Sequence, residues 1–282
     1  MCVIAIVTDS TAYLTHEEAV ALGVVVVPMS YSFSDNQSFN EGCIDADFKA
    51  EMEVAEHIDS VHTSQASLNG FINTFKLLKK AGYEILCLTI SSRLSGTYAN
   101  AVLAAKEVGK QHIEIVDSLT TCSGLYLLIR EARMRIRAGA KLSAVAKEMQ
   151  KLRERVRICF SVDDMAPLRR SGRLGNVRMS VSTVLNIKPI LEMRDGAVVS
   201  AGLARGRLDQ ANKLCAFCKD AKGLLVVDNF LGAEAAEKLP VKLAREDREI
   251  ERRRIGPVLG AHLGRGCVGV AYIAEDPGKG KK

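Results

Sequence analysis

The stretch that decides the fold is VIAIVTDST, residues 3–11. Its apolar, β-branched first half, Val3 to Val7, predicts a buried strand, and the polar residues from Thr8 to Thr11 predict a turn into a helix. Thr15 is well placed to cap that helix, because two glutamates follow in the first turn. Gly23 ends the helix, and Val24–Val27 predicts a second strand.

The same alternation of strands and helices continues to residue 152. Further strands are predicted at residues 85–90 and 113–116, and helices at 71–81, 98–108, 125–138 and 142–152. This order is typical of a parallel sheet with right-handed crossovers, in which ligands bind beyond the carboxyl ends of the strands. The polar pairs Asp9-Ser10, Ser91-Ser92 and Asp117-Ser118 fall at those ends. We therefore expect an α/β fold whose N-terminal part has a mainly parallel, Rossmann-like sheet.

The pattern changes near residue 157, where we place a boundary between an N-terminal α/β domain, 1–156, and a C-terminal α/β domain, 157–282. The second part predicts a strand from Cys159 to Met165 that leads into a basic loop, Arg169 to Arg178. A hairpin is expected around Asp195-Gly196. Later elements are a helix at 208–219, a strand at 223–227 and a final strand within 264–274. The charged stretch Lys242 to Arg254 is expected to be a solvated helix face.

Composition narrows the class of protein. The 282 residues are 48% hydrophobic with a net charge of +6, aromatic residues make up 5%, and tryptophan is absent. These values do not favour nucleic-acid binding. No apolar run approaches 18 residues, so we expect no membrane span. Eight cysteines, several in apolar runs, and no secretory signal favour the cytoplasm. A single pair, Cys215-x-x-Cys218, lies within a helical pattern and does not favour a metal site.

Two hydroxyl-rich segments could bind an anion. The segment from Ser91 to Thr97 follows an apolar strand and opens a helix, whose first N–H groups attract negative charge. Ser95 and Thr97 add hydroxyl donors there. Thr63-Ser64-Gln65 opens another helix in the same way. Helix capping alone is the alternative for each segment, but two such segments at one sheet edge favour an acidic ligand.

The C-terminal half carries two further candidates. The arginines of Arg169-Arg170-Ser171-Gly172-Arg173 suit phosphate or carboxylate, and a solvated basic turn is the alternative. His262-Leu263-Gly264-x-Gly266 would allow close backbone approach to a ligand, and a structural histidine is the alternative. A hydrolase built from Ser95, His262 and Asp9 is not favoured, because no G-x-S-x-G motif is present.

Taken in order, these segments resemble the DegV family, whose fatty-acid-binding members are the lipid-presenting subunits of bacterial fatty acid kinase. The resemblance extends from about residue 3 to residue 274. Its matching stretches are Val7–Thr11, Thr63–Gln65, Ser91–Thr97, Val116–Ser118, Val162–Asp164, Ser171–Arg173, Ile187–Leu191, Asp195–Gly196 and His262–Gly266. The resemblance implies a two-domain α/β fold with one acyl chain buried between or beneath the domains.

The resemblance also implies roles for individual residues. Thr63 and Ser95 stand where similar proteins hold the carboxylate. Residues expected in the vicinity of the head group are Ser64, Ser92, Gly96, Thr97 and His262. Arg170 and Arg173 are expected to contact a phosphoryl group or the partner. The chain departs from the family pattern at three places. Ala66 stands where members commonly have proline. The other two departures are the charged segment 241–254 and Arg93.

The implied function is binding without catalysis by the chain alone, with no metal and no cofactor besides the bound long-chain fatty acid. The partner is the kinase subunit, an ATP-dependent enzyme that converts the acid to an acyl-phosphate for phospholipid synthesis; transient membrane contact is compatible with this role. A neutral Thr/Ser pair suits it, because it binds a carboxylate without a fixed counter-charge. The alternatives are a stand-alone acyl hydrolase, a small-acid phosphotransferase and a lipid-sensing regulator.

Overall fold

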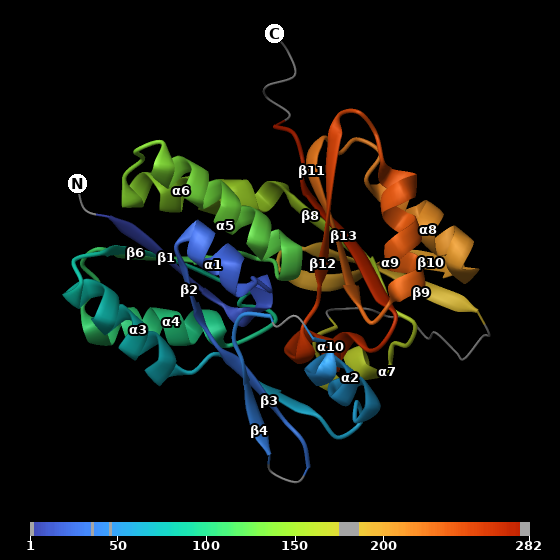
Figure 1. The fold of residues 1–282 in the computed structure, drawn as a ribbon, viewed down its shortest axis with the longest axis horizontal. Coiled ribbons are helices and arrows are strands. Elements are labelled where there is room, and N and C mark those ends of the chain that lie inside the picture. Colours follow the sequence, from blue (N-terminus) through green and yellow to red (C-terminus); the bar gives the residue numbers. More distant parts are fainter. Residues whose placement is uncertain (1–2, 35–36, 45–46, 175–185, 277–282) are drawn as a thin grey trace. The chain divides into compact units, whose positions relative to one another are not determined.

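A computed structural model describes residues 3–34, 37–44, 47–174 and 186–276 (Figure 1). Contacts along the chain divide it into two compact units. Unit 1 comprises Met1–Phe48 and Ser60–Glu154, and unit 2 comprises Lys49–Asp59 and Arg155–Lys282. The predicted division into domains 1–156 and 157–282 stays a prediction.

Unit 1 is built on the parallel sheet that the sequence predicted. Its strands lie in the order β2-β1-β6-β7, with bounds β1 (Ile4–Asp9), β2 (Val24–Val27), β6 (Glu84–Thr89) and β7 (Ile113–Asp117). Every residue of β1 is buried, as expected for an apolar strand with a neighbour on each side and helices on both faces. The mainly parallel, Rossmann-like arrangement is therefore confirmed.

Helices cover both faces of this sheet. On one side lie α3 (Leu68–Lys80) and α4 (Thr97–Val108), and on the other lie α1 (His16–Leu22), α5 (Cys122–Arg137) and α6 (Leu142–Leu152) (Figure 1). The predicted cap of α1 is confirmed. The Thr15 side chain accepts from the N–H of Glu18, and the Glu18 carboxylate accepts from the N–H of Thr15.

A small antiparallel sheet in unit 1 was not predicted. It has the order β4-β3-β5, with bounds β3 (Met29–Ser32), β4 (Ser38–Glu41) and β5 (His62–Ser64). Thr63 and Ser64 thus belong to a strand, which corrects the expectation that they open a helix. Tyr31 pairs with Thr63 on one side and stacks on Phe39 on the other, 5.4 Å between ring centroids. The turn predicted at Asp35-Asn36 lies outside the described residues.

Unit 2 contains a six-stranded mixed sheet. The order is β10-β9-β8-β13-β11-β12, with bounds β8 (Val156–Ser161), β9 (Ile187–Arg194), β10 (Ala197–Arg205), β11 (Gly223–Phe230), β12 (Arg248–Arg254) and β13 (Cys267–Ile273). The helices α8 (Gly206–Phe217) and α9 (Ala233–Leu243) pack on it. The predicted hairpin is confirmed, since Asp195 and Gly196 both have positive φ between β9 and β10.

Three short helices complete unit 2: α2 (Lys49–Glu56), α7 (Ala166–Ser171) and α10 (Pro257–Leu263). Both α2 and α7 pack on α10. The prediction of a basic loop from Arg169 is wrong at its start, because residues 169–171 form the end of α7 before Gly172. The later part of that loop, from residue 175 to Arg178, lies outside the described residues.

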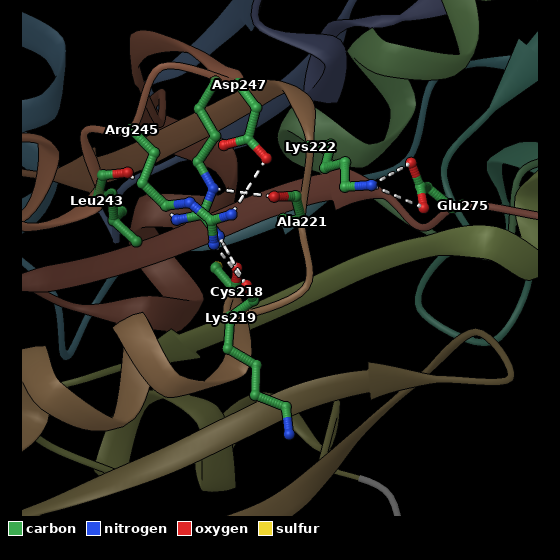
Figure 2. A network of polar contacts seen from close by, with 9 residues as sticks. Cys218, Lys219, Ala221, Lys222, Leu243, Arg245, Asp247 and Glu275 are labelled. Carbon is green, nitrogen blue, oxygen red and sulfur yellow. Dashed lines mark hydrogen bonds and ion pairs between the residues drawn. The ribbon is translucent and has the colours of Figure 1, made fainter. Parts of the chain in front are cut away.

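The charged stretch Lys242 to Arg254 is also corrected. Only its first two residues are helical, and Arg248–Arg254 is strand β12, paired in parallel with β11. Arg248 donates to the carbonyl oxygens of Ala221 (2.9 Å), Lys219 (3.1 Å) and Leu243 (3.2 Å), three groups seen in Figure 2. One guanidinium therefore satisfies carbonyls at the end of α9 and just after α8, which a solvated helix could not do.

Candidate functional site

The carboxyl ends of the parallel strands in unit 1 are tied together by Asp9. Its buried carboxylate accepts from the N–H of Ile90 (2.7 Å) and from both the N–H (3.0 Å) and the hydroxyl (2.6 Å) of Thr11. Burial raises the pKa of Asp9, and these hydrogen bonds lower it in part. Because both oxygens already hold the fold together, Asp9 does not suit the role of acid in a catalytic triad.

Asp117 fixes the loop after β6. Its Oδ1 accepts from the N–H groups of Ser92 and Leu119, both at 3.1 Å. The N–H of Ser91 donates to the carbonyl of Thr120 at 2.8 Å. The segment 91–97 is therefore held at its base by β7 and the turn behind it, while Ser92 itself is exposed.

The two hydroxyl-rich segments meet at Thr97. The buried Thr97 Oγ1 lies 2.9 Å from Ser95 Oγ and accepts from the N–H of Ala66 at 3.2 Å. Asn100 strengthens the junction by donating to the carbonyl of Ala66 at 2.9 Å. Thr63 lies three residues before Ala66, a stretch of at most about 11 Å. The structure thus brings the segments of Thr63 and Ser95 together.

Helix capping accounts for only part of these hydroxyls. The N–H of Gly70 donates to Ser67 Oγ at 3.0 Å, so Ser67, not Thr63 or Ser64, caps α3. The N-cap residue of α4 is Gly96, which has no side chain to offer, and Ser95 Oγ instead accepts from the N–H of Thr97 at 3.3 Å. A Cβ at Gly96 would collide with the Gln65 carboxamide, which lies over this turn. The first N–H of α4 is therefore engaged by Ser95, and the Gln65 carboxamide packs against the turn.

In unit 2, the predicted arginines already have partners. Arg170 Nη1 lies 2.7 Å from Asp59 Oδ1, and its Nη2 donates to the carbonyl of Ile58 at 3.3 Å. Arg173 donates to the carbonyl of Ser171 and is exposed. A phosphoryl group that binds Arg170 would have to replace Asp59. Because this ion pair is exposed, breaking it costs little free energy.

His262 lies in the last turn of α10. Burial lowers its pKa to about 4, and the nearby positive charge of Arg173 acts in the same direction. The imidazole is therefore neutral at pH 7 and can donate one hydrogen bond and accept another. Thr63 and Ser95 belong to unit 1, whereas His262, Arg170 and Arg173 belong to unit 2, so a single site formed by all five stays a prediction.

The role of Asp163, just after β8 (Val156–Ser161), was not predicted from the sequence. Its carboxylate pairs with Lys188 Nζ (2.9 Å) and Arg207 Nη2 (3.0 Å). A Cβ at Gly266 would collide with Asp163 Oδ2. Three stretches that carried the family resemblance thus converge on one carboxylate. The motifs gave a signal for Asp163, Lys188 and Gly266 separately, but nothing in the sequence pointed to Arg207.

Other candidate chemistry is not supported by the local geometry. Cys215 lies in α8 and Cys218 at its end; burial raises the pKa of both thiols, that of Cys218 to about 12. In the described ranges, no three His, Cys, Asp or Glu side chains gather closely enough to hold a metal ion. The same ranges contain no helix with the length and apolarity needed to cross a membrane.

Comparison with known proteins agrees with this architecture. The sequence model of the family described as "Uncharacterised protein, DegV family" matches residues 3–275. A DegV domain-containing protein of Halalkalibacterium halodurans is 33% identical, over 98% of this chain and 100% of its own length. One from Deinococcus radiodurans is 32% identical, over 95% of this chain and 97% of its own length.

Solved structures extend the likeness to the fold. A DegV family protein from Thermus thermophilus, described as fatty-acid binding, has a TM-score of 0.86 and 28% identity, covering 96% of this chain and 99% of its own. DegV from Bacillus subtilis, described as a fatty acid binding protein, has a TM-score of 0.84 and 26% identity, covering 98% and 100%. Both relatives therefore share the fold over nearly their whole length.

Proposed function

This chain belongs to the DegV family, and on that premise we propose that it binds one long-chain fatty acid and presents the carboxylate to a separate ATP-dependent kinase. The kinase forms the acyl-phosphate that enters phospholipid synthesis. The junction of the two hydroxyl-rich segments at Thr97 is the observation that carries this proposal. The fatty-acid binding of the Thermus thermophilus and Bacillus subtilis relatives supports the same ligand.

Neutral hydroxyls suit a carboxylate that must later react. In this proposal Thr63 and Ser95 donate to the carboxylate, and no cation competes for the oxygen that receives the phosphoryl group. Residues near the head group are Ser64, Ser92, Gly96, Thr97 and His262. Burial of the apolar tail supplies most of the affinity, because each buried CH₂ contributes about 0.8 kcal/mol. A sixteen-carbon chain would supply about 10 kcal/mol before the costs of ordering.

The chain itself acts as a carrier in this proposal. Asp9 is engaged in structural hydrogen bonds, and the low pKa of His262 makes it a weak base at neutral pH. Arg170 and Arg173 contact the transferring phosphoryl group or an acidic surface of the kinase. To make this contact, Arg170 releases Asp59 and pairs with the phosphoryl group or the acidic surface instead.

Native mass spectrometry of the protein purified from cells tests the ligand. We expect one long-chain fatty acid per chain, and phosphorylation of the bound acid when a fatty acid kinase and ATP are added. Turnover of an acyl ester by the isolated chain, without a co-purified fatty acid, would contradict the carrier role. Retention of the acid without phosphorylation would instead favour a lipid sensor.

The double variant Thr63→Ala, Ser95→Ala tests the head-group site. Loss of two hydrogen bonds to a charged group should weaken fatty-acid binding about 100-fold or more. Titration of delipidated protein with a fluorescent fatty acid measures this change. Ser67→Ala is the matched control, because its hydroxyl caps α3 instead. Full retention of the lipid by the double variant would place the carboxylate elsewhere.

A further inference from the structure

The hydroxyl of Thr97 has a fixed set of partners. A hydroxyl donates one proton and accepts through two lone pairs. Thr97 Oγ1 accepts from the N–H of Ala66 at 3.2 Å and lies 2.9 Å from Ser95 Oγ. These are its partners among the described residues, so Ser95 Oγ is the acceptor that can receive the Thr97 proton. The reverse assignment would leave a fully buried donor unsatisfied, at considerable cost.

This assignment determines what Ser95 can do. Ser95 Oγ accepts from the Thr97 hydroxyl and also from the N–H of Thr97 at 3.3 Å. Both of its lone pairs are then occupied. Its own proton has no acceptor among the side chains and carbonyls that the structure describes. Ser95, which is only half-buried, therefore presents an O–H donor and no accepting capacity.

We infer that Thr97 is a positioning residue that fixes Ser95 as a hydrogen-bond donor and thereby selects ligands whose head group only accepts hydrogen bonds. An ionised carboxylate is such a group. A primary amide of the same shape is not, because its NH₂ needs an acceptor that Ser95 does not offer. The inference rests on the proposed function and adds to it the basis of head-group selectivity.

Thr97 also has a purely structural task, because it holds the N–H of Ala66 and so joins the two segments. Loss of that bond would weaken binding of every head group alike. The ratio of affinities for acid and amide separates the two tasks, since only the donor role of Ser95 distinguishes between these ligands.

The test compares Thr97→Val with Thr97→Ser, using delipidated full-length protein, hexadecanoic acid and hexadecanamide. Thr97→Val keeps the shape but frees a lone pair on Ser95, so the acid-to-amide affinity ratio should fall about tenfold. Thr97→Ser keeps the hydroxyl and should preserve the wild-type ratio. Thr89→Val is the matched control, because Thr89 is equally buried and its hydroxyl has no hydrogen-bond partner in the described ranges.

An unchanged ratio in Thr97→Val, with both affinities lowered equally, would overturn the inference and leave the proposed function intact. A wild-type protein that binds neither ligand would overturn the proposed function itself, and the inference with it. Should Thr97→Val fail to fold, NMR of the wild type provides a second measurement. The Thr97 hydroxyl proton should exchange slowly with water and show a nuclear Overhauser effect to the Ser95 β-protons. A slowly exchanging Ser95 hydroxyl directed at Thr97 would contradict the assignment.

Discussion

Unit 1 gathers hydroxyls and backbone amides around Thr97, whereas unit 2 gathers charged side chains around Asp163. In unit 1 the hydroxyls of Ser95 and Thr97 are neutral, so an anion bound to them would not have to displace an ion pair. In unit 2, Lys188 and Arg207 share one carboxylate, and Arg170 pairs with Asp59. An anion that binds there must replace an existing partner. On the proposed function, we expect the neutral region to retain the ligand, and the charged region to be structural or to exchange its partners.

Gly266→Ala should lower the free energy of unfolding more than the other variants. It tests whether the Asp163 carboxylate is held rigidly against the turn at Gly266. Gly266 has φ +83°, and a Cβ would collide with Asp163 Oδ2. Backbone strain and the collision together should lower the free energy of unfolding by about 4 kcal/mol. Urea unfolding measures the loss. Gly172→Ala is the matched control, since Gly172 has φ +68° but open space around it, and should cost about 1 kcal/mol. Equal losses would show that Asp163 does not press on this turn.

His262 should make unit 2 sensitive to acid. Its pKa is lowered from 6.5 to about 4, so the unfolded chain binds more protons than the folded one between these values. The free energy of unfolding should therefore fall as the pH drops from 6.5 to 4, by up to about 3 kcal/mol. His262→Gln should flatten that part of the profile. A slope that His262→Gln leaves unchanged would assign the sensitivity to other groups.

Asp163→Asn should change the free energy of unfolding least. The salt dependence of this change tests whether the region around Asp163 is stabilised by charge. Lys188 and Arg207 would lose their counter-charge, which should cost about 1 kcal/mol at low ionic strength and less at 1 M salt, because these side chains are partly exposed. Thr97→Val should also destabilise the protein, but to the same extent at both salt concentrations, since its hydrogen bonds are neutral. Salt dependence in both variants, or in neither, would remove the distinction between the two regions.

The sequence predicted those elements whose own residues specify them. The apolar run of β1 and the helix cap at Thr15 show in local residue patterns, and both are confirmed. Strands β3 and β4 are short and polar, and they depend on cross-strand packing such as Tyr31 against Phe39. Strand β12 is almost entirely charged and is a strand because β11 pairs with it. Local patterns do not contain such pairings.

The candidate site, like the fold, could be predicted where local patterns specify it. Ser95 and Thr97 follow from a strand, a polar loop and a helix in sequence. The bond from Ala66 to Thr97 spans 31 residues, and the pair of Arg207 with Asp163 spans 44. Such links depend on how the crossovers close, and a single sequence carries no trace of them. Some residues of the two regions could therefore be predicted from the sequence. Whether neutral hydrogen bonds or ion pairs connect them could not.

The path of residues 49–59 has a consequence for any attempt to take the protein apart. This segment leaves unit 1, packs into unit 2 and returns, so the chain passes between the units three times. A fragment starting at Arg155 would lack α2, which packs on α10, and would lack Asp59, the partner of Arg170. A fragment ending at Glu154 would carry α2 without the surface it covers. Neither half is thus a self-sufficient expression product, and a protease cut at residue 154 would nick the molecule rather than divide it.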